Sequence, residues 1–410
     1  MTPNAKQPMV LVGSGSQIWR EYLLPAMAEK YSLHLLTPKE PTWEVPYIAG
    51  FDLVDTMDAK AMEEAARARF EEVAGILTYE ETRVESAARL ATAFGVRTSP
   101  PEAVYACRDK YASREAMRRA GLPGAQSIAV ATLEEAESAA RIIGYPLIVK
   151  PRALSASCGV SLVTEPGGLP AAVEEAARIW FDVVPTYEQP TLVEEYLEGP
   201  EISVEAVCRD GQVTALFVAR KSLGFPPGFE EVGHLVRSDD PLLRDPDLLG
   251  LLQAAHRAVG LTDTITHTEI RLTQAGPRVV EINARVGGGR IPYLGQLATG
   301  VDVGLAAADL AAGAEPALEP VRTGVAAIRF LYPERDLRVE AIDVDRGKLP
   351  PEAHEVQVLA KPGDELLLPP TDHVRSRYAF VVVTAPDEKT CTAALDEAAA
   401  ALTVRGTPLS

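Results

Sequence analysis

The stretch EINARVGGGR, residues 281–290, joins a polar alternation to three consecutive glycines. Successive side chains of a β-strand point to opposite faces, so Glu281, Asn283 and Arg285 share one face and the apolar residues between them share the other. A strand face that carries a carboxylate, a carboxamide and a guanidinium is too polar for a hydrophobic core. The pattern therefore predicts either a solvated face or a functional site.

A second polar strand precedes this stretch and is expected to pair with it. THTEIRL (266–272) and RVVEINARV (278–286) flank TQAGP, a glycine-containing connection of the hairpin type. A turn centred near Ala275 places Glu269 opposite Glu281. Two carboxylates in that position repel each other, so we expect a cation between them.

The residue types on these two strands indicate which cation this is. Carboxylate and amide oxygens suit Mg²⁺, which keeps some of its waters and is usually completed by substrate phosphates. We therefore expect Glu269, Glu281 and Asn283 to bind metal. Arg285 is then free to contact a phosphate or carboxylate oxygen in a bidentate way. The alternative is a solvated face on which the arginine neutralises the acids.

Composition limits the ligands that the chain can attract. Its 410 residues, 47% apolar and 24% charged, are typical of a soluble globular protein. The formal net charge of −18 argues against nucleic acid or an anionic membrane as a partner. No apolar run approaches the ~20 residues of a membrane span, and the N-terminus does not resemble a signal peptide. The four cysteines are scattered, so we expect a cytoplasmic protein without a zinc site.

The order of strand-like and helix-like segments suggests three regions. Residues 1–100 are predicted to form an open, mostly parallel α/β domain. Residues 101–320 form the central region, with a lid over about 122–192. Residues 321–410 are predicted to form a small α+β domain dominated by antiparallel strands. The proline pair at positions 100 and 101 is interpreted as a linker.

A glycine-rich turn near the N-terminus offers a weaker alternative. VLVGSGSQIW contains Gly13 and Gly15 between a strand and a helix, but Ile18 occupies the third glycine position of a dinucleotide fingerprint. A nicotinamide oxidoreductase is therefore a distant alternative. The turn can also be an ordinary tight turn whose amides accept an anion.

Other segments supply what a metal–phosphate site needs besides its metal ligands. Lys150 ends the apolar run YPLIVK and is followed by the small-residue loop LSASCGV (154–160), whose amides could cradle phosphate oxygens. In LVEEYLEGPE (192–201) an apolar strand leads to a hinge that could read an adenine edge, while Glu201 takes the ribose hydroxyls. Taken singly, these features have ordinary alternatives, a solvated strand-end lysine and a charged loop.

The order of these segments resembles the ATP-grasp superfamily of carboxylate–amine ligases, and within it the L-amino acid ligases that form dipeptides. The resemblance rests on the pair Asp109 and Lys110, IVKP at Lys150, SASCGV, VEEYLEGPE, HTE at Glu269 and EINAR. It implies an ATP-grasp fold of α/β and α+β type. This fold would comprise an N-terminal Rossmann-like domain, a central region with a lid, and a small C-terminal α+β domain.

The resemblance also implies a role for each matching residue. The residues implied to bind ATP are Lys110, Lys150, Ser155, Ser157, Gly159, Glu194, Glu195, Leu197 and Glu201. Glu269, Glu281 and Asn283 match the Mg²⁺ ligands, usually of two ions, and Mn²⁺ is an alternative metal. Arg285 matches the arginine that steadies the acyl phosphate and the tetrahedral intermediate. Glycines let the backbone approach a ligand, so Gly287, Gly288 and Gly289 are expected beside the substrate.

KSLGFPPGFEEVGH (221–234) resembles the substrate loop of the family. Glu231 and His234 then resemble the pair near the amino group of an amino-acid substrate. Either side chain could take the proton of an attacking amine. The alternative for His234 is an ordinary loop histidine whose ring bonds to backbone.

The expected reaction forms an acyl phosphate from ATP and a carboxylate, after which an amine attacks it to give an amide, ADP and phosphate. The alternatives are ligation of an amino acid to a carboxylate of another kind, carboxylation of the biotin type, and an ATP-binding regulator without turnover. The expected partners are small-molecule substrates, neither nucleic acid nor membrane, and a homodimer is left open.

Overall fold

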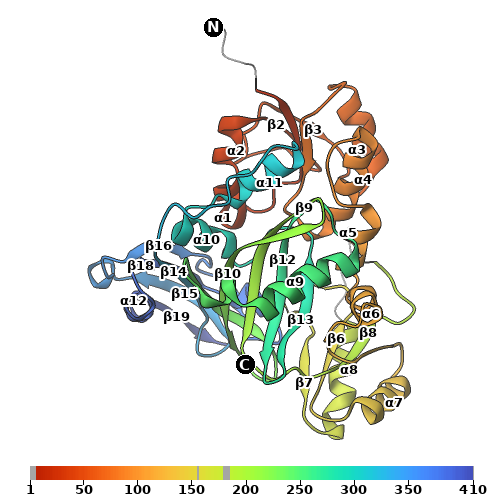
Figure 1. The fold of residues 1–410 in the computed structure, drawn as a ribbon. Helices are drawn as coiled ribbons and strands as arrows, with labels where there is room; N and C mark the ends of the chain where they lie inside the picture. Colours follow the sequence, from red (N-terminus) through yellow and green to blue (C-terminus); the bar gives the residue numbers. More distant parts are fainter. Residues whose placement is uncertain (1–5, 155–156, 179–184, 410) are drawn as a thin grey trace.

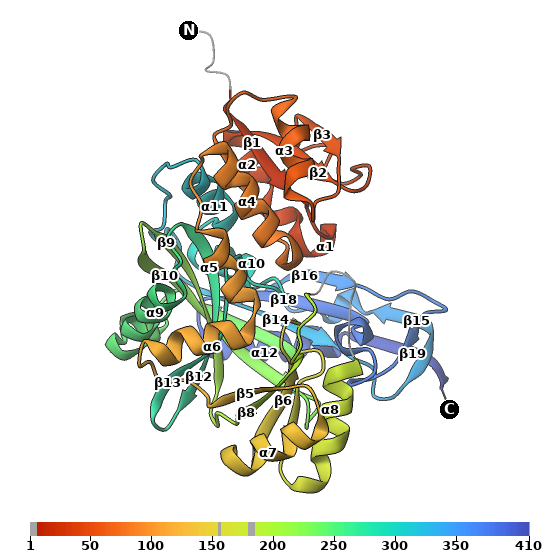
Figure 2. The same ribbon diagram turned by 90° about the vertical axis from the view of Figure 1, so that its right-hand side faces the viewer.

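The computed structural model describes residues 6–154, 157–178 and 185–409 and arranges them in four sheets. In Figure 1 the N-terminal region lies at the top, and the long central sheet lies below it. The C-terminal region extends to one side of the central sheet, and the region predicted as a lid lies at its lower end. Figure 2 shows these parts after a quarter turn.

The N-terminal region is an open parallel sheet, as predicted, with strand order β3-β2-β1-β4. Its elements are β1 (Pro8–Val12), α1 (Gln17–Arg20), α2 (Pro25–Lys30), β2 (Ser32–Thr37), β3 (Gly50–Leu53), α3 (Ala59–Arg67), β4 (Gly75–Leu77) and α4 (Val84–Phe94). Strand β1 is apolar on both faces because helices cover both sides of the sheet. Helices α3 and α4 cover one face, while α2 and α11 (Val303–Ala311) cover the other.

One eight-stranded antiparallel sheet forms the centre of the molecule. Its order is β13-β12-β9-β10-β11-β14-β18-β16. The strands are β9 (Glu201–Arg209), β10 (Gln212–Gly224), β11 (Glu230–Arg237), β12 (Thr264–Thr273), β13 (Gly276–Asn283), β14 (Val325–Leu331), β16 (Ala353–Val358) and β18 (Ala379–Ala385). Since β14 pairs with β11, this sheet continues across residue 320 into the C-terminal region.

Strand β9 shows how the central sheet separates core from site. Ile202 and Val204 are buried against the helices α5 (Pro101–Arg108), α6 (Lys110–Arg119) and α9 (Pro246–Val259). Glu201, Ser203 and Glu205 alternate with them and therefore point to the opposite face. Along this part of β9, one face of the sheet is thus hydrophobic core and the other carries polar groups. Farther along the second face, Val207 packs in another hydrophobic core.

The region predicted as a lid contains a separate antiparallel sheet with order β5-β8-β6-β7. Its elements are β5 (Ser127–Val130), α7 (Leu133–Ile143), β6 (Leu147–Pro151), β7 (Ser161–Val163), α8 (Leu169–Arg178) and β8 (Thr191–Glu195). The apolar sides of α7 and α8 pack together on one face of this sheet. The opposite face is turned toward the central sheet and bears Lys150 and Glu194, which both line the cavity described below.

The C-terminal region combines part of the central sheet with a small sheet of its own. The small sheet has the order β17-β15-β19, and its elements are β15 (Leu337–Val344), β17 (Glu365–Leu366) and β19 (Leu402–Pro408). Helix α12 (Glu388–Ala400) packs between the two sheets, and α10 (Ile291–Thr299) packs on β11 and β14. Among the described residues, no helix is long and apolar enough to cross a bilayer.

Extended Asp109 separates α5 from α6 and caps α6. Two local predictions are wrong. Pro101 is not in a linker but begins α5, where its fixed φ suits the first helical turn. The stretch KSLGFPPGFEEVGH is not mainly a loop, because β10 continues to Gly224 and β11 begins at Glu230.

Candidate active site

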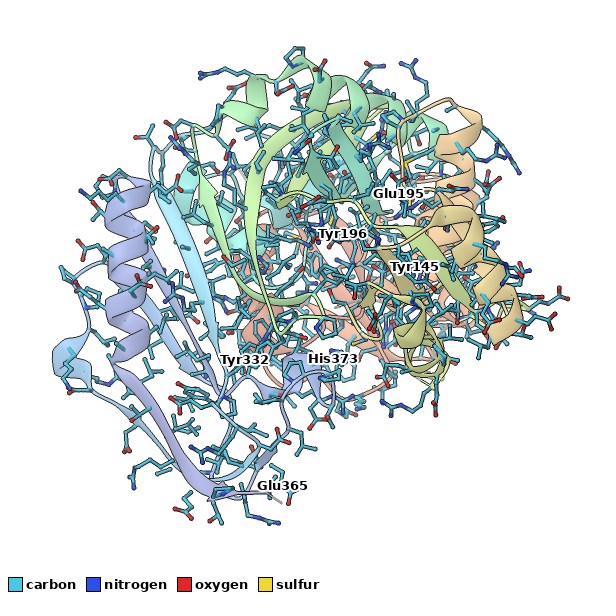
Figure 3. The ribbon with its side chains drawn as sticks, turned by 90° about the horizontal axis from the view of Figure 1, so that it is seen from below. Tyr145, Glu195, Tyr196, Tyr332, Glu365 and His373 are labelled. Carbon is cyan, nitrogen blue, oxygen red and sulfur yellow. The ribbon has the colours of Figure 1, made fainter. Side chains whose placement is uncertain are left out.

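A cavity of about 1030 Å³ lies where the N-terminal region, the lid sheet, the central sheet and the C-terminal region meet. Each part contributes to its wall, for example Trp19, Lys150, Glu281 and Arg377 in that order. Figure 3 shows Glu195 and Tyr196 on the lid side, with Tyr332 and His373 of the C-terminal region across from them. Ligand pockets usually measure ~300–1000 Å³, so this cavity has room for a nucleotide and a second substrate.

Most of the predicted site residues line this cavity. They are Lys110, Lys150, Ser157, Glu194, Glu195, Leu197, Glu201, Glu231, Glu269, Glu281, Asn283, Arg285, Gly288 and Gly289. Gly159, His234 and Gly287 are not part of its lining. Ser155 lies outside the described residues.

A row of charged side chains crosses five adjacent strands of the central sheet on the cavity face. It consists of Glu281 on β13, Glu269 on β12, Glu201 on β9, Lys221 on β10 and Glu231 on β11. The row is stepped, because Glu269 lies opposite Ser203 and Glu201 lies opposite Arg271. Lys221 joins the two sides of the step, since it contacts Glu201, Glu231 and Glu269.

The hairpin of β12 and β13 has the predicted pairing at its functional end. Glu269 lies opposite Glu281, and His267 lies opposite Asn283. The ladder shifts after this point, because Ile270 pairs with Val279 and Val280 is left as a bulge.

Glu281 lies in an environment with excess negative charge. Lys110 Nζ lies 3.2 Å from its carboxylate, but burial and the neighbouring Glu269 and Glu81 raise the pKa of Glu281 above its ordinary value. With its amide nitrogen as the donor, Asn283 bonds to Glu81 Oε2 and Glu281 Oε1 at 3.2 Å each, so its amide oxygen remains available. A divalent cation at these oxygens would relieve the repulsion, and the donor set therefore fits Mg²⁺.

Lys110 and Arg285 supply positive charge beside Glu281 and Asn283. Lys110 is the first residue of α6, a position that the Asp109 cap fixes, and Asp109 is itself paired with Arg152 at 2.6 Å. Arg285 Nε lies 2.5 Å from Glu81 Oε2, and Nη1 donates to the Val286 carbonyl at 2.7 Å. Burial lowers the pKa of Arg285, but Glu81 outweighs this effect and raises it, so the guanidinium stays charged.

The lid sheet contributes a buried group of three charges. Lys150 Nζ lies 2.5 Å from Glu194, and Arg114 of α6 lies 3.1 Å from the same carboxylate. Burial would raise the pKa of Glu194, but the two cations lower it to about 2. Glu194 is therefore ionised, and its side chain balances Lys150 in this structure.

Glu205 and His267 form a buried pair beneath the glycine segment. His267 Nδ1 contacts Glu205 Oε1, its Nε2 lies 3.4 Å from Glu269, and Gly287 donates its amide to Glu205 at 3.1 Å. A side chain at Gly287 would collide with both, since a Cβ there would lie 2.6 Å from Glu205. Burial lowers the pKa of His267, but Glu205 and Glu269 raise it to about 9. The pair thus fixes Glu269 and the backbone of Gly287 together.

The opposite end of the row contains Glu231 and His234. His234 Nε2 lies 3.4 Å from Glu231 Oε2, and the imidazole is fully buried behind Gly289. Burial lowers the pKa of His234, so its ring is neutral near pH 7. Neither ring nitrogen has a hydrogen bond to any of the described residues. His234 is therefore not the backbone-bonded loop histidine of the alternative reading; it supports Glu231 from a strand.

Sequence reasoning missed several residues that hold this site together. Glu81 follows β4, at the end where ligands of parallel sheets usually bind, and the polar run YEETR was a usable signal. Glu205 and Lys221 follow the alternation of side chains along β9 and β10, in which every second residue points to the same face of the sheet. Arg114 carried no such signal, because its partner Glu194 is eighty residues away.

Comparisons with known proteins agree with this geometry. Residues 143–292 match the ATP-grasp domain, and residues 329–406 match the L-amino acid ligase C-terminal domain 2. An alanine–anticapsin ligase of Bacillus subtilis is 30% identical over 296 residues, which are 64% of this chain and 61% of that protein. The chain thus spans about three fifths of the length of that relative.

Two solved structures share the fold over nearly the whole chain. The L-amino acid ligase from Bacillus licheniformis has a TM-score of 0.79 at 20% identity, covering 99% of this chain and 100% of that one. The biotin carboxylase domain of the 2-oxoglutarate carboxylase from Hydrogenobacter thermophilus, crystallised with MgADP, ADP and bicarbonate, has a TM-score of 0.70 at 18% identity, covering 98% and 92%. At such identities the likeness establishes the fold alone. Together with the two matched domains, it shows that the chain contains an ATP-grasp domain and an L-amino acid ligase C-terminal domain on the fold that these structures share.

Proposed function

We propose that the protein activates the carboxylate of one amino acid as an acyl phosphate and joins it to the amine of a second amino acid. The observation that carries this proposal is the row of charged residues across five adjacent strands. It has metal-type ligands at one end of the cavity and Glu231, with His234 behind it, at the other. The similarity to an alanine–anticapsin ligase supports an amino acid as one substrate.

The nucleotide is proposed to bind between the lid sheet and the central sheet. Adenine would lie along the backbone of Glu195 and Leu197, and Glu201 would accept hydrogen bonds from the ribose hydroxyls. Lys110 and Lys150 would contact the phosphates, with Ser157 and Gly159 in the loop above them. Lys150 would have to exchange its contact with Glu194, 2.5 Å away, for a phosphate oxygen.

In the first step a substrate carboxylate oxygen attacks the γ-phosphorus of ATP, and the bond from that phosphorus to the leaving oxygen of ADP breaks. This step needs neutralisation of charge more than covalent help. Lys150 and Arg285 supply positive charge from opposite sides of the cavity. Glu269, Glu281 and Asn283 would hold Mg²⁺, proposed to be two ions. The bound metal would neutralise charge and orient the phosphates.

In the second step the amine nitrogen attacks the acyl carbon, the carbon–oxygen bond to phosphate breaks, and the amine loses a proton. Glu231 lines the cavity and would hold the amine, while His234 lies behind it. Burial favours the neutral imidazole, which can accept a proton through Glu231. Gly288 and Gly289 leave the backbone exposed beside the acyl group.

A screen of amino-acid pairs for ATP-dependent phosphate release, with products identified by mass, tests this proposal. The expected result is ADP, phosphate and a dipeptide in equal amounts, and no product when either amino acid is left out. Turnover only with a carboxylate of another kind would redirect the proposal to that substrate. Turnover only with bicarbonate would replace it with carboxylation, and ATP binding without any phosphate release would replace it with a regulatory role.

A further inference from the structure

One buried ammonium group holds three carboxylates of the site together. Lys221 Nζ lies 2.7 Å from Glu231 Oε1, 2.7 Å from Glu269 Oε1 and 3.1 Å from Glu201 Oε1. Its side chain is only 1% exposed. An ammonium carries three donors and no acceptor, so Lys221 can give one donor to each acid.

Each of the three acids also contacts a second group, which differs from one acid to the next. Arg271 lies 2.8 Å from Glu201 Oε2, and His234 lies 3.4 Å from Glu231 Oε2. Glu269 Oε1, shared with Lys221, lies 3.4 Å from His267. Glu269 Oε2 accepts no hydrogen bond from the part of the chain that the structure describes, so it remains free for a ligand.

Without Lys221 these acids would repel one another. One oxygen of each lies within 4.8 Å of an oxygen of the other two, and all three residues are partly buried. A cation among them relieves the repulsion of such closely spaced, partly desolvated like charges. Burial lowers the pKa of Lys221, but the three acids outweigh this effect and raise it well above its ordinary value, so the cation is permanent.

We propose that Lys221 is a positioning residue that couples the nucleotide subsite to the amine subsite. The proposal rests on the roles proposed above, in which Glu201 contacts ribose, Glu269 binds metal and Glu231 holds the amine. One ammonium fixes all three acids. When one acid moves, the ammonium therefore moves with it, and the electric field that the other two acids experience changes. Lys221 therefore sets the geometry of both subsites without contacting the reacting atoms.

The neighbouring residue provides a matched control. Arg220 points to the opposite face of β10, where its guanidinium binds the buried Asp240 at 2.9 and 3.1 Å. Arg220→Met removes a cation of the same strand from a buried acid outside the cavity. Lys221→Met makes the same kind of change beside three acids that line the cavity.

The test measures Mg-ADP affinity by calorimetry and the KM values for ATP and the amine substrate in the wild type, Lys221→Met, Lys221→Arg and Arg220→Met. We expect Lys221→Met to weaken Mg-ADP binding and to raise the amine KM, each by at least about tenfold, which is about 1.4 kcal/mol. Lys221→Arg should change both by a smaller factor, because it keeps the positive charge. Some change is expected because a planar guanidinium cannot offer the same three donors. Arg220→Met should leave both within twofold of the wild type.

Single substitutions of the acids separate coupling from a merely structural role. Glu201→Gln should weaken Mg-ADP binding and, through Lys221, also raise the amine KM by a smaller factor, and Glu231→Gln should do the reverse. Both of these cross-effects should shrink in the Lys221→Met background. If the lysine variants fold, as judged by circular dichroism, and both affinities stay within twofold of the wild type, the proposal is overturned. If Lys221→Met does not fold, Lys221→Arg decides by the same criterion.

Failure of the proposed function would look different. Wild-type protein that binds Mg-ADP but forms no product with any amino-acid pair refutes the ligase proposal. The calorimetric comparison of Lys221→Met with Arg220→Met needs no turnover, so it still shows whether Lys221 supports the nucleotide subsite. Equal Mg-ADP affinities in those two variants would then overturn the positioning role.

Discussion

Glu269 faces Glu281 across the hairpin of β12 and β13 only because β13 contains a bulge at Val280. The hairpin closes with Thr273 opposite Gly276, and an unbroken ladder from that turn would pair Glu269 with Val280. A shift of one residue moves a side chain to the other face of a sheet. The bulge therefore turns Glu281 and Asn283 into the cavity.

Loss of the Glu281 carboxylate should stop the reaction without unfolding the protein. We expect Glu281→Gln to lower ADP formation by at least ~100-fold, because it removes a charged metal ligand at the reacting phosphate. The thermal midpoint should stay close to that of the wild type, since Glu269 and Glu81 already repel this carboxylate. An ADP-release assay and a thermal melt measure the two effects. Ordinary turnover in the variant would refute the metal assignment.

Arg285 should serve the chemical step more than nucleotide binding. Arg285→Ala is expected to lower kcat by ~10²–10³-fold and to leave Mg-ADP affinity within about threefold of the wild type. Glu81→Gln should change kcat in the same direction by less, because Glu81 orients the guanidinium at 2.5 Å. Single-turnover kinetics combined with calorimetry separate the two effects. A change confined to ATP affinity would move Arg285 to the nucleotide subsite.

Gly289 should tolerate no side chain, whereas its neighbour Gly288 should tolerate one. Gly289 has a φ of +56°, and a Cβ there would lie 2.5 Å from His234 Nε2. A Cβ at Gly288 would meet no atom within 4 Å. We expect Gly289→Ala to displace His234 and raise the amine KM at least about tenfold, with ATP affinity unchanged. Gly288→Ala should raise the amine KM by a smaller factor, because its methyl group meets the substrate but no protein atom. Equal losses in both variants would point to lost cavity volume instead.

Protonation of His256, which lies outside the cavity, should lower the free energy of unfolding as the pH falls. This fully buried ring contacts the Leu252 carbonyl at 2.7 Å and the Thr266 hydroxyl at 2.8 Å. Burial lowers its pKa from 6.5 to about 4, so the fold favours the neutral ring. The stabilising contribution is complete above the unfolded pKa near 6.5 and is lost as the pH falls toward 4.

Urea unfolding between pH 4 and pH 8 measures this effect. The wild type should lose up to about 3 kcal/mol of unfolding free energy more than His256→Leu over this range. The difference between the two proteins isolates His256 from the carboxylates that titrate in the same window. Parallel pH profiles for the two proteins would contradict the assignment.

The sequence was most informative where function imposes a local pattern. The alternation of Glu281, Asn283 and Arg285 predicted a polar strand face, and the predicted pairing with Glu269 is confirmed. A turn centred on Ala275 correctly paired Glu269 with Glu281, although the true turn is one residue shorter. The extra residue of the bulge compensates for the shorter turn. A bulge leaves no clear signal in a single sequence, so this agreement could not have been derived.

Long-range charge balance was not predictable from the sequence. Lys150 and Arg114 share Glu194, and Lys221 shares three acids from three other strands, because folding brings together segments far apart in the chain. Lys110 likewise reads as a solvated helix residue until the cap at Asp109 and its contact with Glu281 are seen. The stretch around Glu231 suggested a loop because it resembles the substrate loop of the family, although only residues 225–229 connect β10 to β11.

The pairing of β11 with β14 means that the C-terminal region is not a detachable module. Strand β11 carries Glu231 and His234, and Arg377 of the C-terminal region donates to the Glu231 carbonyl at 2.8 Å. Truncation after residue 320 would turn β11 into an exposed edge strand that invites intermolecular pairing. The half of the site proposed to receive the amine is therefore built jointly by two segments that, in evolution or in engineering, can be exchanged only as a unit.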